Sequence, residues 1–440
     1  MSSRSFMERF FNGLRGDRPA RSAMSLCRAL MGERGEASGA ALARDALAAF
    51  GALGAAERAQ FFDVLALEFS PSAEDVDRAA AAYRLERSTA NLQRLQRAAE
   101  PARQELFRRI NMAPGGTAAL IEMRRELLAG LGEHPSWQAI DADLLHLLRS
   151  WFNRGFLRLE RIDWRTPAIV LEKLIRYESV HAIRGWSDLH RRLEADRRCY
   201  AFFHPQLPEE PLIFIEVALT HGVSARVQPL LDAASTVEDP GHSNCAVFYS
   251  INNCQDGLRG ISFGDLLIKQ VAENLRRELP RVRKFVTLSP IPGFRQWLAA
   301  ERVHLARGPR GEERMALLDA LERPGWQDSA AATPLHGLLL PLCAHYLLRA
   351  KKGTEPLDAV SRFHLGNGAS LERINWLGDT SEHGMAISAG MMVNYVYRLS
   401  HVERNHERFV KEHHVEASRE VEGLARESPF AAGETEAARA

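Results

Sequence analysis

Two side chains capable of proton chemistry stand at the ends of predicted elements in the second half of the chain. Ser289 closes the strand-like run Lys284–Ser289 and precedes Pro290, which cannot donate to a sheet ladder, so the strand has to end near this serine. His364 lies beside a Gly-Asn-Gly loop, where a ligand can reach it, and histidine is the usual proton donor near neutral pH. Structural interpretations remain open, because Ser289 could cap the next helix and a lone histidine is often part of a core.

A glycine-bearing turn joins another predicted strand, Cys245–Ile251, to the helical pattern Asp265–Leu279. The turn reads Arg259-Gly260-Ile261-Ser262-Phe263-Gly264. Glycines let backbone N–H groups approach a phosphate closely, and the helix that follows adds its partial positive charge. Arg259 supplies a full charge, so the turn could hold a pyrophosphate without a metal. Such turns often bind nothing, and this one is a weak signal by itself.

The first third of the chain carries apolar residues at three- and four-residue spacing, which predicts helices. Ser70-Pro71-Ser72 and Pro114-Gly115-Gly116 interrupt this pattern, as expected of helix ends. No residue here has an obvious chemical role, so we expect a packing domain used for assembly. The predicted helices are 41–53, 56–69, 73–98, 102–110, 117–131 and 137–152.

After residue 155 strand-like and helical runs alternate, which predicts an α+β or mixed α/β domain. We therefore expect a helical domain over 1–154, a mixed domain over 155–415 that contains Ser289 and His364, and a flexible tail over 416–440. The predicted strands are 212–220, 245–251, 284–289 and 391–397, and the predicted helices are 265–279, 295–306, 315–321 and 335–348.

The composition excludes several classes of protein. The net charge is only +1 at pH 7, which argues against a nucleic-acid partner, and no apolar run is long enough to span a membrane. The five cysteines form no CxxC pair, so we expect reduced thiols of a bacterial cytoplasm and no metal site. The histidines between 401 and 414 lack the four-residue spacing of a helical metal site, and a solvated helix is expected there.

The strand–turn–helix order around Arg259 resembles the acetyl-CoA site of GNAT-type N-acetyltransferases. Their loop is usually Q/R-x-x-G-x-G/A, and this chain has Ser262 where the middle glycine usually stands. A side chain at that position should narrow the loop or add a hydroxyl contact to a phosphate.

Taken together, four strings in this order are similar to the malonyl-CoA decarboxylase family: FYSI with GLRG, LSPIPGF, FHLGNGA with RINW, and GMMVNYVY. The resemblance covers most of residues 155–400. It implies an N-terminal helical domain followed by an acetyltransferase-like catalytic domain, with Ser289 and His364 as the catalytic pair. It also implies that CoA is bound by the segment Arg259, Gly260, Ile261, Ser262, Phe263, Gly264 and Asp265.

The resemblance implies conversion of malonyl-CoA to acetyl-CoA and carbon dioxide without a metal or organic cofactor. A CoA-dependent acyltransferase and a non-catalytic CoA-binding scaffold remain as alternatives, because the loop suits both. The apolar helical faces predict a homo-oligomer, dimer or tetramer. Tyr395 and Tyr397 lie on the strand-like run 391–397, and the sequence does not choose which approaches the pocket.

Overall fold

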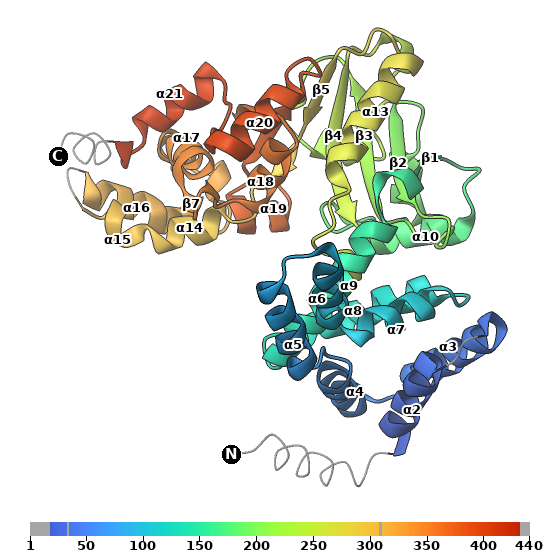
Figure 1. Ribbon diagram of the computed structural model, residues 1–440. Helices are drawn as coiled ribbons and strands as arrows, with labels where there is room; N and C mark the ends of the chain where they lie inside the picture. The colour runs from blue at the N-terminus through green and yellow to red at the C-terminus, as the bar shows by residue number, and fades with distance from the viewer. Residues whose placement is uncertain (1–17, 33–34, 308–309, 432–440) are drawn as a thin grey trace. The chain divides into compact units, whose positions relative to one another are not determined.

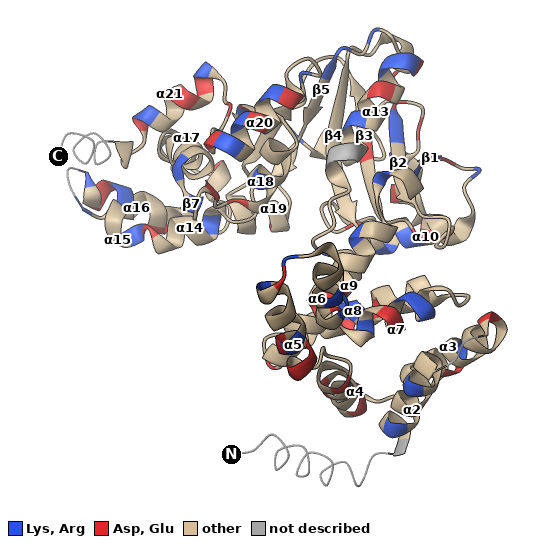
Figure 2. Cartoon of the chain, in the orientation of Figure 1, with Lys and Arg blue, Asp and Glu red and all other residues tan. Residues whose placement is uncertain are grey.

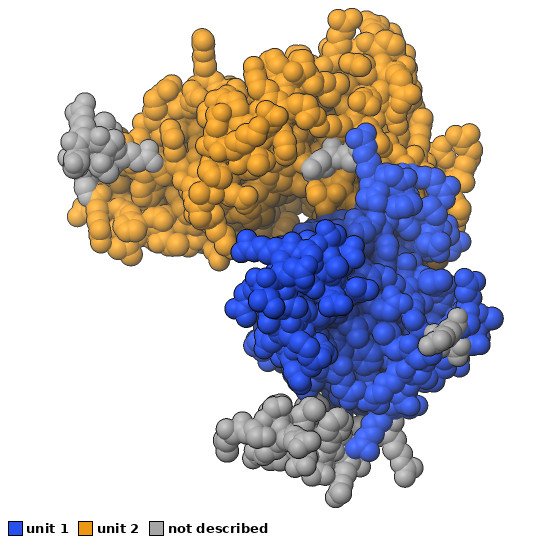
Figure 3. Space-filling model, viewed as in Figure 1, with its two compact units in different colours: residues 1–158, 204–210, 255–261 blue, residues 159–203, 211–254, 262–440 orange. Residues whose placement is uncertain are grey.

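The computed structural model describes residues 18–32, 35–307 and 310–431. The chain forms two compact units, coloured separately in Figure 3. Unit 1 comprises residues 1–158, 204–210 and 255–261, and unit 2 comprises 159–203, 211–254 and 262–440. Because 255–261 group with unit 1, the division passes through the predicted CoA-binding loop, between Ile261 and Ser262.

Unit 1 is built from helices (Figure 1). The prediction of one helix over 73–98 is wrong, because the helix is interrupted at residues 86–88. Ser88 caps the second helix by accepting a hydrogen bond from the Asn91 N–H at 3.3 Å. The helices are α2 (Arg18–Gly32), α3 (Glu36–Gly51), α4 (Ala55–Glu68), α5 (Ala73–Leu85), α6 (Thr89–Ala99), α7 (Ala102–Asn111), α8 (Gly116–Gly130) and α9 (Gln138–Trp151).

Unit 2 is centred on a mixed sheet with the strand order β1-β2-β3-β4-β5-β10-β6, and β9 pairs with β10. Two further short strands, β7 (Lys351–Lys352) and β8 (Glu355–Pro356), pair with each other. The strands of the main sheet are β1 (Arg158–Ile162), β2 (Arg197–Phe203), β3 (Ile213–Thr220), β4 (Cys245–Asn253), β5 (Lys284–Thr287), β6 (Ser289–Pro290), β9 (Ser370–Asn375) and β10 (Met392–Val396).

The parallel pair β4 and β5 determines where a ligand can enter the sheet. Helix α13 (Gly264–Glu278) connects these strands, since parallel strands need a crossover (Figure 1). Their pairing ends at Phe248 opposite Thr287, but β4 continues to Asn253. The strands therefore part at their carboxyl ends, the usual place for a ligand in such sheets. The expected α+β class is confirmed.

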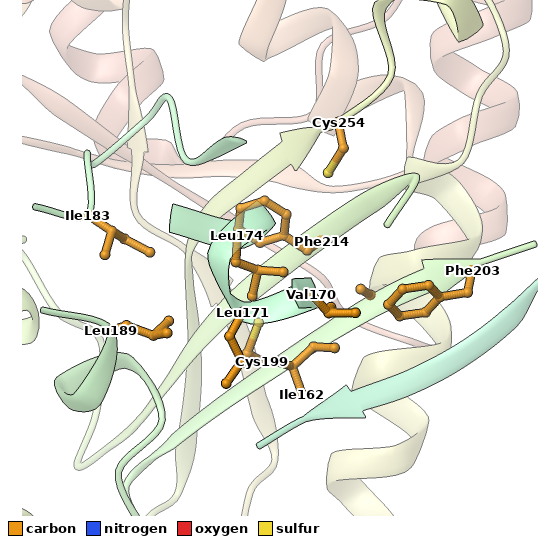
Figure 4. Packing of buried hydrophobic residues seen from close by; sticks show 11 residues of the cluster. Ile162, Val170, Leu171, Leu174, Ile183, Leu189, Cys199, Phe203, Phe214 and Cys254 are labelled. Carbon is orange, nitrogen blue, oxygen red and sulfur yellow. The ribbon is translucent and has the colours of Figure 1, made fainter. Parts of the chain in front are cut away.

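The remaining helices cover this sheet or form the region after β6. Figure 4 shows α10 packed on β2 and β3 through side chains that include Leu171, Leu174, Cys199 and Phe214. The helices are α10 (Ala168–Tyr177), α11 (Trp186–Arg192), α12 (Gln228–Leu231), α14 (Phe294–Ala300), α15 (Arg302–Leu305), α16 (Gly311–Leu321), α17 (Ala332–Arg349), α18 (Ala359–Gly366), α19 (Glu382–Ser388), α20 (Val402–Glu412) and α21 (Arg419–Glu427).

Part of the expected tail is folded. Helix α21 lies within 416–440, and its Val421 and Ala425 are buried. Residues 432–440 lie outside the described residues. Along the part of the chain that is described, no helix is long and apolar enough to cross a membrane.

Charged residues of both signs are interspersed on the helices of each unit (Figure 2). All five cysteines are buried and form no disulfide in the structure. Strand β2, which the sequence analysis missed, is buried throughout despite beginning with two arginines. Arg197 pairs with Asp196 at 2.9 Å and Arg198 with Glu278 at 2.6 Å, so these charges are compensated.

Candidate active site

Ser289 lies where the strand expected over 284–289 breaks into β5 and β6. It pairs with Val393 of β10, and its hydroxyl donates to Thr287 Oγ1 at 2.9 Å. The alternative role as a helix cap is wrong, because α14 begins at Phe294 with Gly293 as its N-cap and has no side-chain cap. The serine hydroxyl is therefore available to another partner.

That partner is His364, whose Nε2 lies 3.1 Å from Ser289 Oγ. The histidine is in the last turn of α18, a helix capped at its start by Asp358, which accepts from the Ser361 N–H at 2.8 Å. The cap fixes the start of α18 and so helps to set the position of its last turn. Two residues 75 positions apart in the sequence thus form one hydrogen-bonded pair.

Both candidate tyrosines of the strand-like run contact His364. The Tyr397 hydroxyl lies 2.8 Å from His364 Nδ1, while the Tyr395 ring stacks on the imidazole with 4.7 Å between centroids. The Tyr395 hydroxyl is instead 2.6 Å from Ser361 Oγ. Residues two apart on a strand face the same side, which is the sequence signal that these two tyrosines belong to one site.

These contacts fit one assignment of the protons on the imidazole. With the Ser289 hydroxyl donating to Thr287 Oγ1, His364 Nε2 is assigned as the donor to Ser289 Oγ. A neutral imidazole has one donor and one acceptor, so Nδ1 accepts from the Tyr397 hydroxyl. The result is a line of hydrogen bonds that runs from Tyr397 through His364 to Ser289.

The imidazole is neutral in the resting protein. His364 is only 3% exposed, and its burial lowers the pKa to about 3. Desolvation disfavours the charged form, and among the described residues no carboxylate offsets it. The expectation of a histidine that titrates near neutrality is therefore wrong for the free protein.

A cavity of about 340 Å³ opens onto this pair where β4 and β5 part. Its lining contains no Lys, Arg, Asp or Glu among the residues that the structure describes, and its polar groups are hydroxyls, an amide and the imidazole. The lining residues are Val180, Phe248, Tyr249, Ser250, Ile251, Asn253, Ser289, Pro290, Ala359, Val360, Phe363 and His364.

The predicted phosphate loop ends beside the same cavity. A Cβ on Gly264, the first residue of α13, would lie 2.2 Å from the Phe363 ring, so a side chain there would collide with a cavity-lining residue. Gly260 has φ of +87°, a conformation that favours glycine. Within the described residues, the N–H groups of Gly260, Phe263 and Gly264 donate to no acceptor of the chain.

The side chains of the loop differ in their surroundings. Arg259 is 71% exposed and lies 3.8 Å from Asp256, while Phe263 is buried and Ser262 is exposed. Ile261 is partly buried, and the side chain of Asp265 lies outside the described part. The Arg259 side chain is therefore largely in contact with solvent.

No cluster of His, Cys, Asp and Glu suited to a metal occurs among the described residues. Two of the histidines after residue 400 have other contacts: His406 Nδ1 lies 2.6 Å from the Gly366 carbonyl oxygen, and His414 lies 3.4 Å from Glu416.

Comparison with known proteins identifies the family of the chain. Residues 155–435 match the family model of the malonyl-CoA decarboxylase C-terminal domain, and residues 69–152 match that of the N-terminal domain. The mitochondrial malonyl-CoA decarboxylase of Anser anser anser is 38% identical over 346 residues, which are 73% of this chain and 69% of the relative.

Two crystal structures have the same architecture over most of the chain. Malonyl-CoA decarboxylase from Rhodopseudomonas palustris is 49% identical with a TM-score of 0.87, covering 91% of this chain and 98% of that one. The enzyme from Agrobacterium vitis is 47% identical with a TM-score of 0.87, covering 92% and 99%. The chain belongs to the malonyl-CoA decarboxylase family.

Proposed function

We propose that the protein converts malonyl-CoA to acetyl-CoA and carbon dioxide, with Ser289 and His364 at the reacting end of the substrate. The observation that carries the proposal is the hydrogen-bonded line of Tyr397, His364 and Ser289 beside a cavity that, among the described residues, has no cationic lining. Family membership supports the substrate, and the site residues are assigned from this geometry.

The uncharged lining suits loss of carbon dioxide. Cleavage of the bond between the α-carbon and the carboxylate leaves an electron pair that the thioester carbonyl delocalises as an enolate. A cation paired with the carboxylate would stabilise the substrate more than the transition state, from which that charge is leaving. The Ser289 hydroxyl can instead orient the carboxylate by turning its proton away from Thr287.

The enolate then needs a proton on carbon, and a neutral imidazole can supply it because the enolate carbon is a far stronger base. His364 gives its Nε2 proton to the carbon while the Tyr397 hydroxyl proton passes to Nδ1. Solvent restores the missing proton after product leaves, so one proton is consumed per carbon dioxide released. The imidazole stays neutral throughout, in keeping with its lowered pKa.

The CoA moiety is assigned to the segment Arg259–Asp265. Unpartnered backbone N–H groups, the start of α13 and the exposed Arg259 side chain suit its phosphates. Gly264 adjoins Phe363 of the cavity, so a thioester held by its phosphates there can extend toward His364.

Incubation of the purified protein with malonyl-CoA in EDTA tests the function. We expect acetyl-CoA and carbon dioxide in equal amounts without an amine acceptor, and one deuterium in the acetyl methyl group when the solvent is D₂O. Turnover that requires an amine acceptor would instead indicate an acyltransferase. CoA binding without any turnover would indicate a scaffold.

We also propose that the protein self-associates as a dimer or tetramer in a bacterial cytoplasm, partly through residues 1–154. Helix α5 has no buried residue, and Leu85 at its end is 92% exposed, which is unusual for an apolar side chain. The buried thiols suit a reducing compartment. Light scattering at micromolar concentration tests the association, and a monomer would refute it.

A further inference from the structure

A buried arginine of the helical unit holds the backbone of the phosphate loop. Arg124, on α8, is 2% exposed and donates through Nε to Asp141 Oδ1 at 2.8 Å. Its Nη1 donates to two carbonyl oxygens, those of Gly257 at 2.7 Å and Arg259 at 2.8 Å. All these residues belong to unit 1. A buried guanidinium needs such partners, and two of its acceptors are in or next to the loop.

The surrounding contacts fit this attachment closely. A Cβ on Gly257 would lie 2.0 Å from the carbonyl oxygen of Ile121, so only glycine allows the chain to lie this close to α8. Arg149, on α9, donates to the next loop carbonyl, that of Gly260, at 3.3 Å. Carbonyl oxygens of the loop are therefore directed toward cations of the helical unit.

Peptide geometry turns this attachment into a prediction about the N–H groups. The carbonyl of Arg259 and the N–H of Gly260 belong to one trans peptide, in which they point in opposite directions. Because Arg124 binds that carbonyl, the Gly260 N–H is directed away from Arg124. This N–H has no acceptor within the described residues. A cation on the carbonyl also polarises the peptide, which strengthens its N–H as a donor.

We propose that Arg124 is a positioning residue that presents the Gly260 N–H to a phosphate of CoA. This inference rests on the proposed CoA-binding role of the loop. It adds that the orientation of one loop peptide is set by a side chain more than 130 positions earlier in the chain.

The variant Arg124→Lys keeps the charge but loses the fork that reaches two carbonyls. We expect the Kd for CoA by calorimetry and the KM for malonyl-CoA each to rise about tenfold, as for loss of one charge-assisted hydrogen bond, with kcat within about twofold. Malonyl-pantetheine keeps the reacting thioester but lacks the phosphates. The kcat/KM of the variant for malonyl-pantetheine should therefore equal that of the wild type, whereas a damaged fold would lower kcat/KM for both substrates.

Arg103→Lys is the matched control. Arg103 is equally buried in the helical unit, 3% exposed, and binds Asp143 and Ser70 instead of the loop. Its CoA affinity should equal that of the wild type. Equal losses in the two variants, or unchanged CoA affinity in Arg124→Lys, would overturn the proposal. Calorimetry measures CoA binding without turnover, so it tests the role of Arg124 even if the protein proves not to be a decarboxylase.

Hydrogen exchange provides a second measurement on the unaltered protein, in case substitution of a buried arginine prevents folding. The Gly260 amide should exchange at least about tenfold more slowly once CoA is bound, because it then donates to a phosphate. Unchanged exchange at Gly260 in CoA-saturated protein would show that this N–H does not meet the ligand, and would overturn the proposal.

Discussion

Tyr397→Phe tests the proton relay, which is the proposed transfer of the Tyr397 hydroxyl proton to His364 Nδ1 while Nε2 gives its proton to the substrate. The substitution removes one hydroxyl, which lies 2.8 Å from His364 Nδ1, and leaves the ring in place. Nδ1 then becomes a buried acceptor without its donor, which should lower the free energy of unfolding by about 1–3 kcal/mol. The proton that Nε2 gives up can no longer be replaced through Nδ1.

The expected effect of Tyr397→Phe on kcat comes from the lost proton transfer and not from the lost stability. Positioned acids contribute about a hundredfold or more, which is roughly 2.7 kcal/mol of barrier at 1.36 kcal/mol per factor of ten. We therefore expect kcat to fall about a hundredfold, while KM changes little because the hydroxyl is assigned no contact with CoA. Steady-state release of acetyl-CoA, beside chemical denaturation of the same samples, measures both quantities.

Tyr395→Phe is the matched control, because it removes the same group from the same strand next to the same imidazole. The Tyr395 hydroxyl bonds to Ser361, while its ring stacks on His364 and would remain. This variant should lose similar stability but keep kcat within about threefold. Equal losses of kcat in both variants, or near-normal turnover in Tyr397→Phe, would refute the relay.

Three further predictions address the other parts of the site. Ser289→Ala should lower kcat about a hundredfold and weaken the preference for malonyl over acetyl thioesters. If the two residues act as one unit, the double variant with His364→Asn should have a kcat little lower than that of the poorer single variant, and additive losses in steady-state kinetics would contradict this. Arg259→Ala should raise KM about tenfold with little change in kcat, and unchanged calorimetric affinity for free CoA would show that the loop has been misassigned. The folded pKa of His364, about 3, is below its unfolded value of 6.5, so its contribution to stability is present above pH 6.5 and is lost as pH falls toward 3. Between pH 6.5 and 4.5, the free energy of unfolding should therefore fall by about 2–3 kcal/mol more in the wild type than in His364→Asn, as measured by chemical denaturation. Equal falls in the two proteins would count against the buried neutral imidazole.

The sequence predicted the elements whose signals are local. Branched runs identified β3, β4 and β10. The single strand expected over 284–289 is divided into β5 and β6, and Pro290 lies within β6, where it pairs with Met392 of β10. Strand β2 was missed because its two arginines look exposed in the sequence, yet ion pairs with Asp196 and Glu278 allow them to be buried. The helix break at 86–88 was missed because the apolar spacing continues across it, although Ser88 is a good N-cap.

The site was predictable where it depends on motifs and unpredictable where it depends on tertiary packing. Ser289 and His364 were both proposed, but only the fold brings Nε2 within 3.1 Å of Oγ. The pKa of His364 could not be anticipated, because burial depends on every element around α18. Arg124 has no sequence signal at all, since an arginine in an amphipathic helix is normally solvated.

The central claim is that binding and chemistry reside in different residues, with CoA held by the segment Arg259–Asp265 and decarboxylation carried out at His364. The most direct test is His364→Asn, measured for CoA affinity by calorimetry and for turnover of malonyl-CoA in the same preparation. We expect a folded protein with CoA affinity within about twofold of wild type and kcat lower by about a hundredfold or more. Turnover near the wild-type value, or loss of CoA affinity in proportion to turnover, would contradict the account.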